Sequence, residues 1–166
     1  ERLVLHLDAR NDLLALALPP AAQELPPGFV RDRFGSYEAP IALAFIDEQR
    51  LLVAERAGRV WFVDHGVKRN LVVDLTGPVQ DARDRGLMGI AAAPDFDLDG
   101  WIYLLYVVRV PGLAAHGPTY SRLVRMRTEL EPDGNLVARP ETHEVLLGDS
   151  WATGIPACYP QHTLGS

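Results

Sequence analysis

This sequence has little cysteine, no long apolar run and no excess of positive charge. Its 166 residues include one cysteine, Cys158, so no disulfide can form within the chain. No apolar run approaches the roughly 20 residues that a membrane-spanning helix needs. The 16 Lys and Arg are outnumbered by 22 Asp and Glu, which gives a net charge of −6. That balance argues against a nucleic-acid partner, because such a surface needs clustered positive charge.

The hydrophobic pattern predicts an all-β protein. Short apolar runs are separated by turn residues, and no long stripe with a 3.6-residue period is present. Two groups of about four strands follow one another, each group near 50 residues long, which is typical of β-propeller blades. A β-sandwich has similar strand spacing and is the alternative. The expected strands cover residues 29–34, 41–46, 51–55, 59–63 and 71–75, then 87–93, 101–110, 122–128 and 143–147.

The first 24 residues form a separate region. Alternating leucines at 2–8 and a second apolar run at 13–18 predict a β-hairpin, although 13–18 also suits a short helix. A proline-rich linker at about 19–28 follows. The predicted organisation is therefore a hairpin and linker over 1–24 and a propeller domain over 25–166.

Three stretches carry a more specific likeness. They are PIALAFIDEQRLLVAERAGRVWFVD at 40–64, DRGLMGIAAAPDFDLDGWIYLLY at 84–106 and HTLGS at 162–166. In this order and spacing they resemble the glucose/sorbosone dehydrogenase family, whose members are soluble quinoprotein sugar dehydrogenases built as six-bladed β-propellers. The resemblance implies that residues 25–166 supply about two blades and the start of a third, as the N-terminal part of a longer ring. Such an open part leaves strand edges and a blade face uncovered, so alone we expect it to be unstable or prone to aggregation.

The resemblance also implies roles for individual residues. His162 matches the family's catalytic base, which removes a proton from the anomeric hydroxyl of the sugar. Imidazole suits that task because its pKa lies near neutral pH. Asp84 and Arg85 match substrate-side positions, although better-known members have Gln at the position of Asp84. From the residues alone, His162 also fits a surface histidine, and Asp84 with Arg85 also fits a pair that shapes a turn.

The cofactors implied by the resemblance are pyrroloquinoline quinone and calcium, with most of their binding residues beyond residue 166, so the chain alone should be inactive. The implied substrate is a small sugar and the implied location is extracytoplasmic, with no nucleic acid and no membrane span among the partners. The electron acceptor stays open. Two other functions remain as alternatives: a non-catalytic propeller that binds carbohydrate or protein, and a metal-dependent propeller of the lactonase type.

Other residues that could carry chemistry have simpler interpretations. Asp95, Asp97 and Asp99 have the spacing of a calcium loop but also suit an acidic turn between strands. Cys158 could be a nucleophile with His162 as its base, yet no third orienting group is visible. The expected roles of the remaining candidates are structural: an ion pair or turn anchor for Glu55 and Arg56, and packing between sheets for Trp61, Trp101 and Trp151.

Overall fold

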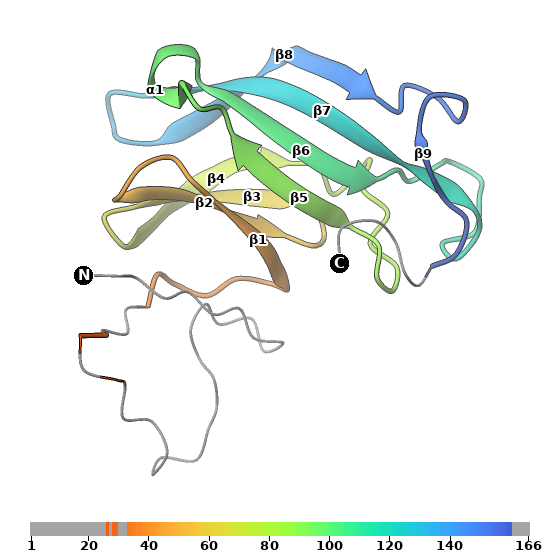
Figure 1. Ribbon diagram of the computed structural model, residues 1–166, viewed down its shortest axis with the longest axis horizontal. Coiled ribbons are helices and arrows are strands. Elements are labelled where there is room, and N and C mark those ends of the chain that lie inside the picture. Colours follow the sequence, from red (N-terminus) through yellow and green to blue (C-terminus); the bar gives the residue numbers. More distant parts are fainter. Residues whose placement is uncertain (1–25, 27, 30–32, 161–166) are drawn as a thin grey trace.

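A computed structural model describes residues 26, 28–29 and 33–160 of the chain (Figure 1). It confirms the all-β prediction, since two antiparallel sheets account for nearly all the regular structure. The first sheet has the order β1 (Pro40–Phe45), β2 (Arg50–Glu55), β3 (Arg59–Asp64) and β4 (Val67–Asp74). The second has the order β5 (Leu87–Ala92), β6 (Trp101–Val107), β7 (Thr119–Leu130) and β8 (Leu136–Leu147), with β9 (Ile155–Ala157) paired to β7.

Tight turns join β2 to β3 and β3 to β4 because the sequence supplies residues that accept left-handed backbone angles. Between β3 and β4, His65 and Gly66 have φ values of 49° and 74°. Positive φ at both central residues is the geometry of two-residue hairpin turns that match the twist of the flanking strands. Between β2 and β3, Gly58 has a φ of 109° and donates its N–H to the carbonyl of Glu55 at 2.9 Å. Consecutive strands are antiparallel neighbours in both sheets, so each forms an up-and-down meander, to which the second sheet adds β9 beside β7.

The two sheets pack face to face, and the main apolar core lies between them (Figure 1). Alternation along the strands places one set of side chains on this shared face. Strand β1 contacts β5 and β4 contacts β8, so corresponding strands of the two sheets are neighbours. Core side chains that are at most 2% exposed include Leu52, Val60, Phe62, Leu87, Ile102, Leu104, Tyr106 and Leu136.

A second, smaller apolar cluster covers the other face of the first sheet. It consists of Phe34, Tyr37, Leu51, Val53 and Val63. Two of its members, Phe34 and Tyr37, come from the segment that precedes β1 and fold back over the sheet. Both faces of the first sheet therefore carry buried apolar residues, as expected for a sheet with a layer on each side.

Several predicted boundaries differ from the observed ones. Strand β4 begins at Val67, and β7 and β8 each have 12 residues, longer than the apolar runs predict. Strand β9 and the four-residue helix α1 (Phe96–Asp99) were not predicted at all. Of the strand expected at 29–34, residues 30–32 lie outside the described part and Phe29, Arg33 and Phe34 are not in a strand. The hairpin predicted within 1–24 also lies outside the described residues.

Helix α1 caps the hairpin between β5 and β6. It ends at Gly100, which has a φ of 65° and whose N–H binds the carbonyl of Phe96 at 2.7 Å. Within the described part of the chain, no helix is long and apolar enough to cross a membrane.

Candidate functional site

The connection that leads into β5 carries the two candidate substrate residues, Asp84 and Arg85. It is attached to the end of β6 at two points. Gln80 donates its N–H to the carbonyl of Val107 at 2.8 Å, and Val107 donates its own N–H to the carbonyl of Gly86 at 2.9 Å. Residues 81–86 therefore form a turn that closes over the end of the second sheet. We name residues 81–86 the site turn.

The first sheet also holds the site turn. Arg56, at the end of β2, donates from Nη1 to the carbonyl of Arg83 at 3.1 Å, and its own carbonyl accepts the N–H of Leu87 at 2.8 Å. Gly86 has a φ of 149°, and a Cβ added there would lie 2.5 Å from the carbonyl oxygen of Arg56. Only glycine allows this approach. The expected role of Arg56, an ion pair or turn anchor within its own blade, is therefore wrong in its location, because the turn that Arg56 holds leads into the neighbouring sheet.

Arg85 points inward from the site turn and has no accessible surface. Its Nη1 donates to the carbonyl of Ala115 at 2.9 Å and its Nη2 to the carbonyl of Ala157 at 3.0 Å. Its Nε has no hydrogen-bond partner, and no described carboxylate lies within ion-pair distance. Burial alone lowers the pKa of the guanidinium below its ordinary value. In this arrangement both Nη atoms of Arg85 bind backbone carbonyls of neighbouring segments.

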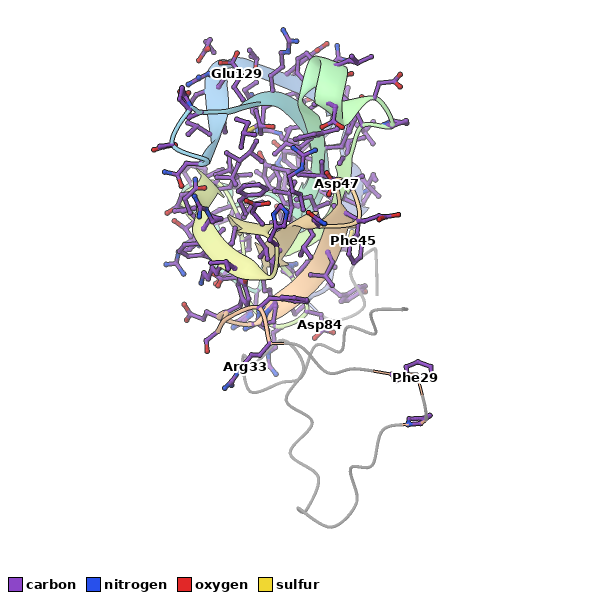
Figure 2. All side chains as sticks on the ribbon, turned by 90° about the vertical axis from the view of Figure 1, so that its left-hand side faces the viewer. Phe29, Arg33, Phe45, Asp47, Asp84 and Glu129 are labelled. Carbon is purple, nitrogen blue, oxygen red and sulfur yellow. The ribbon has the colours of Figure 1, made fainter. Side chains whose placement is uncertain are left out.

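Asp84 is exposed at the same turn, and in Figure 2 it lies on the opposite side of the molecule from Glu129. Its N–H donates to the carbonyl of Pro160 at 3.2 Å. The chain after β9 thus contacts the site turn at Pro160. His162, two residues further on, lies outside the described residues, and the substrate roles of Asp84 and Arg85 remain predictions.

The acidic stretch at 95–99 forms the turn that its alternative interpretation describes. Asp97 accepts Nη2 of Arg50 at 2.6 Å, and Asp99 accepts the N–H of Trp101 at 3.0 Å. Among the described residues, no group of three or more His, Cys, Asp or Glu side chains is placed to hold a metal ion. Asp97 therefore links helix α1 to β2 of the first sheet, and Asp99 holds the start of β6.

The tryptophans and the cysteine have separate surroundings. Trp101 packs under the guanidinium of Arg125, 4.5 Å from its ring centroid, on the face of the second sheet that points away from the core. Trp151 packs against Tyr120 at a centroid distance of 5.3 Å, with the two rings tilted by 53°, and is half exposed. Cys158 is exposed. The expected packing between sheets therefore describes none of the three tryptophans. Trp101 and Trp151 pack on outer surfaces, and Trp61 lies on the outer face of the first sheet, against the smaller apolar cluster.

A hollow of about 380 Å³ that the sequence did not predict lies over the outer face of the first sheet. The Nζ of Lys68 sits 3.7 Å from the ring centroid of Trp61 and 4.3 Å from that of Tyr37. Burial lowers the pKa of Lys68, against the opposing charge of Glu55, and burial with that same charge raises the pKa of Tyr37. The lining residues are Ser36, Tyr37, Glu38, Glu55, Arg59, Trp61 and Lys68.

Two consecutive antiparallel meanders, packed face to face with corresponding strands adjacent, define the class of protein: they are neighbouring blades of a β-propeller. The site turn begins the first strand of the second blade. A sequence model of the Glucose / Sorbosone dehydrogenase family matches residues 37–143. The chain belongs to this family.

Solved structures of sugar dehydrogenases resemble the chain. The crystal structure of a glucose dehydrogenase has 25% identity and a TM-score of 0.52, and the match covers 65% of this chain and 29% of that one. A second glucose dehydrogenase has 30% identity, with coverage of 65% and 29% and a TM-score of 0.48. The PQQ-bound aldose sugar dehydrogenase from Streptomyces coelicolor has 25% identity, with coverage of 66% and 30% and a TM-score of 0.48.

The matched part spans less than a third of the length of each of these structures. No curated protein matches the chain.

Proposed function

We propose that this chain is the N-terminal part of a quinoprotein sugar dehydrogenase that oxidises an aldose at its anomeric carbon. Family membership supports the general activity. The observation that carries the proposal is the hydrogen bond from the Asp84 N–H to the Pro160 carbonyl. It joins the turn of the family's DRGLMG segment to the stretch of chain that leads to His162. Residues 25–166 would form the propeller part, and the whole protein would act outside the cytoplasm.

The proposed reaction divides between a base and a hydride acceptor. The imidazole of His162 takes the proton of the anomeric hydroxyl while a hydride leaves the same carbon, so that the sugar becomes a lactone. Pyrroloquinoline quinone supplies the hydride acceptor when it is bound. The exposed carboxylate of Asp84 accepts hydrogen bonds from sugar hydroxyls but cannot donate one while ionised. This chemistry selects sugars whose hydroxyls donate toward the site turn.

One feature of the described residues suits an anionic quinone that carries carboxylates. The guanidinium of Arg85 is buried without a carboxylate partner, so its positive charge is uncompensated near the site turn. A positive potential in a low-dielectric site attracts anions. The direct ligands of the quinone and the calcium that accompanies it would come from the rest of the ring.

Dye reduction by the full-length protein tests the proposed function. The protein is loaded with pyrroloquinoline quinone and Ca²⁺, a panel of aldoses is added, and the rate is compared between wild type, His162→Ala and His143→Ala. Loss of general-base catalysis should lower kcat by about 10²–10⁴-fold in His162→Ala. His143 lies exposed on β8, so His143→Ala should match wild type.

Two outcomes would overturn the proposal. Equal rates in His162→Ala and wild type would remove His162 as the base. A wild type that binds sugar but reduces no dye with any aldose would instead indicate the non-catalytic propeller, and lactone hydrolysis dependent on an added metal would indicate the lactonase alternative.

A further inference from the structure

We propose that Arg85 is a positioning residue, which holds residues 157–160, the stretch of chain that leads to His162, against the site turn. Its catalytic consequence rests on the function proposed above, whereas its structural part stands on the described residues alone. The geometry behind it is a single buried guanidinium that ties together three segments remote in sequence: the site turn, the loop before β7 and the end of β9.

The first step is the pair of hydrogen bonds that Arg85 donates. One goes to the carbonyl of Ala115, 30 residues along the chain, and the other to that of Ala157, 72 residues along. Hydrogen bonds from a charged donor are stronger than neutral ones, and the planar guanidinium fixes the directions of both. The two carbonyls therefore cannot move independently of the site turn.

The second step is that β9 and residues 158–160 have few other described backbone hydrogen bonds to the rest of the chain. Strand β9 has three residues and pairs with β7 alone, and its central residue, Pro156, has no N–H to donate. Beyond β9, the hydrogen bond from Asp84 to Pro160 leads back to the site turn. The strand pairing of β9 with β7 alone does not fix the direction of residues 158–160. The hydrogen bond from Arg85 to the carbonyl of Ala157 fixes the point from which these residues leave the sheet.

The third step is the environment of the charge. A buried ionised group without a partner of opposite charge is costly, and an apolar side chain of similar size would fill the same space without that cost. Arg109, in the loop between β6 and β7, provides the contrast. It is half exposed, donates to the carbonyl of Val79 from Nε and Nη2 at 3.0 and 2.8 Å, and lies 3.5 Å from a carboxylate oxygen of Asp81. The choice of arginine at position 85 is therefore explained by the two carbonyls it orients rather than by packing.

Amide hydrogen exchange in the full-length protein tests this role without reference to activity. The variants are Arg85→Met, which keeps the volume and removes both bonds, Arg85→Lys, and the control Arg109→Met. In Arg85→Met the Asp84 amide, which donates to Pro160, should exchange at least about tenfold faster than in wild type. The amide of Leu104 in the centre of β6 should be unchanged. Arg109→Met should leave the Asp84 amide at the wild-type rate.

Arg85→Lys should give an Asp84 exchange rate between those of wild type and Arg85→Met, because an ammonium group can reach one carbonyl but lacks the guanidinium fork. If Arg85→Met fails to fold, the same comparison of Asp84 with Leu104 is made in Arg85→Lys, where Asp84 alone should accelerate. In the loaded enzyme, kcat should fall in Arg85→Met and recover in part in Arg85→Lys, with a smaller change in KM.

An Asp84 amide that exchanges at the wild-type rate in Arg85→Met would overturn the proposal. Equal acceleration of Asp84 and Leu104 would also overturn it, because it would mean a general loss of stability. These results are independent of the proposed function, whose failure would be a wild type without sugar oxidation. Local acceleration at Asp84 with an unchanged kcat would keep the anchor and reject its catalytic consequence.

Discussion

Gly86→Ala gives the sharpest test of how the site turn is held. The glycine has a φ of 149°, and a Cβ added there would lie 2.5 Å from both the carbonyl oxygen and the Cγ of Arg56. A non-glycine residue at a positive φ costs about 1–3 kcal/mol, and overpacking against fixed backbone costs about 1–3 kcal/mol more. We therefore expect Gly86→Ala to lower the free energy of unfolding by about 2–6 kcal/mol.

Urea denaturation of the full-length protein, followed by tryptophan fluorescence, measures this loss. Gly77→Ala is the matched control on the same connection, since an added Cβ there meets no atom within 4 Å. The free energy of unfolding of Gly77→Ala should be unchanged or higher by up to about 1 kcal/mol, because alanine restricts the conformations of the unfolded chain. A loss of less than about 1 kcal/mol in Gly86→Ala would refute the argument, since it would mean that Arg56 and the site turn separate at little cost.

Two further predictions concern the core and an acid-sensitive turn. Leu104 is fully buried between the sheets, so Leu104→Ala should lower the free energy of unfolding by about 2–5 kcal/mol. Leu98 is 85% exposed, so in the same denaturation assay Leu98→Ala should change the free energy of unfolding by less than about 0.5 kcal/mol. The pKa of Asp74 lies below its ordinary 3.8 because the hydroxyl and N–H of Thr76 donate to the Asp74 carboxylate. The stabilising contribution of the ionised carboxylate is therefore present above pH 3.8 and is lost as the pH falls through the lower pKa of the folded state. Thr76→Ala should raise that pKa in an NMR titration, and an unchanged pKa would contradict the assignment.

Strand positions in the two sheets could be predicted because alternation and turn residues are local properties. The start of β3 at Arg59 follows from the Ala57–Gly58 turn, and the start of β5 at Leu87 follows from the glycine before it. Strand β9 could not be predicted in this way. It has three residues with a central proline, and it exists because β7 extends far enough to offer it a partner. Helix α1 is a single turn, too short to leave a period in the sequence.

In the candidate site, too, the sequence predicted part of what the structure has and missed the rest. The resemblance to the family implied that Asp84 and Arg85 both lie on the substrate side. In the structure they have opposite surroundings, because Asp84 is exposed and Arg85 has no accessible surface. Burial of a charged side chain cannot be inferred from its neighbours in sequence, since the carbonyls that receive Arg85 come from Ala115 and Ala157.

The sequence by itself determined the all-β class, the grouping into two blades and the family, because these depend on alternation, turn chemistry and motif order. Tertiary structure decided which residues of the motif face solvent and which segments meet at the site turn. The reason is physical: the contacts of Arg85 and the Asp84–Pro160 hydrogen bond join groups 30 to 76 residues apart, and only packing of the folded chain brings such groups within hydrogen-bond distance.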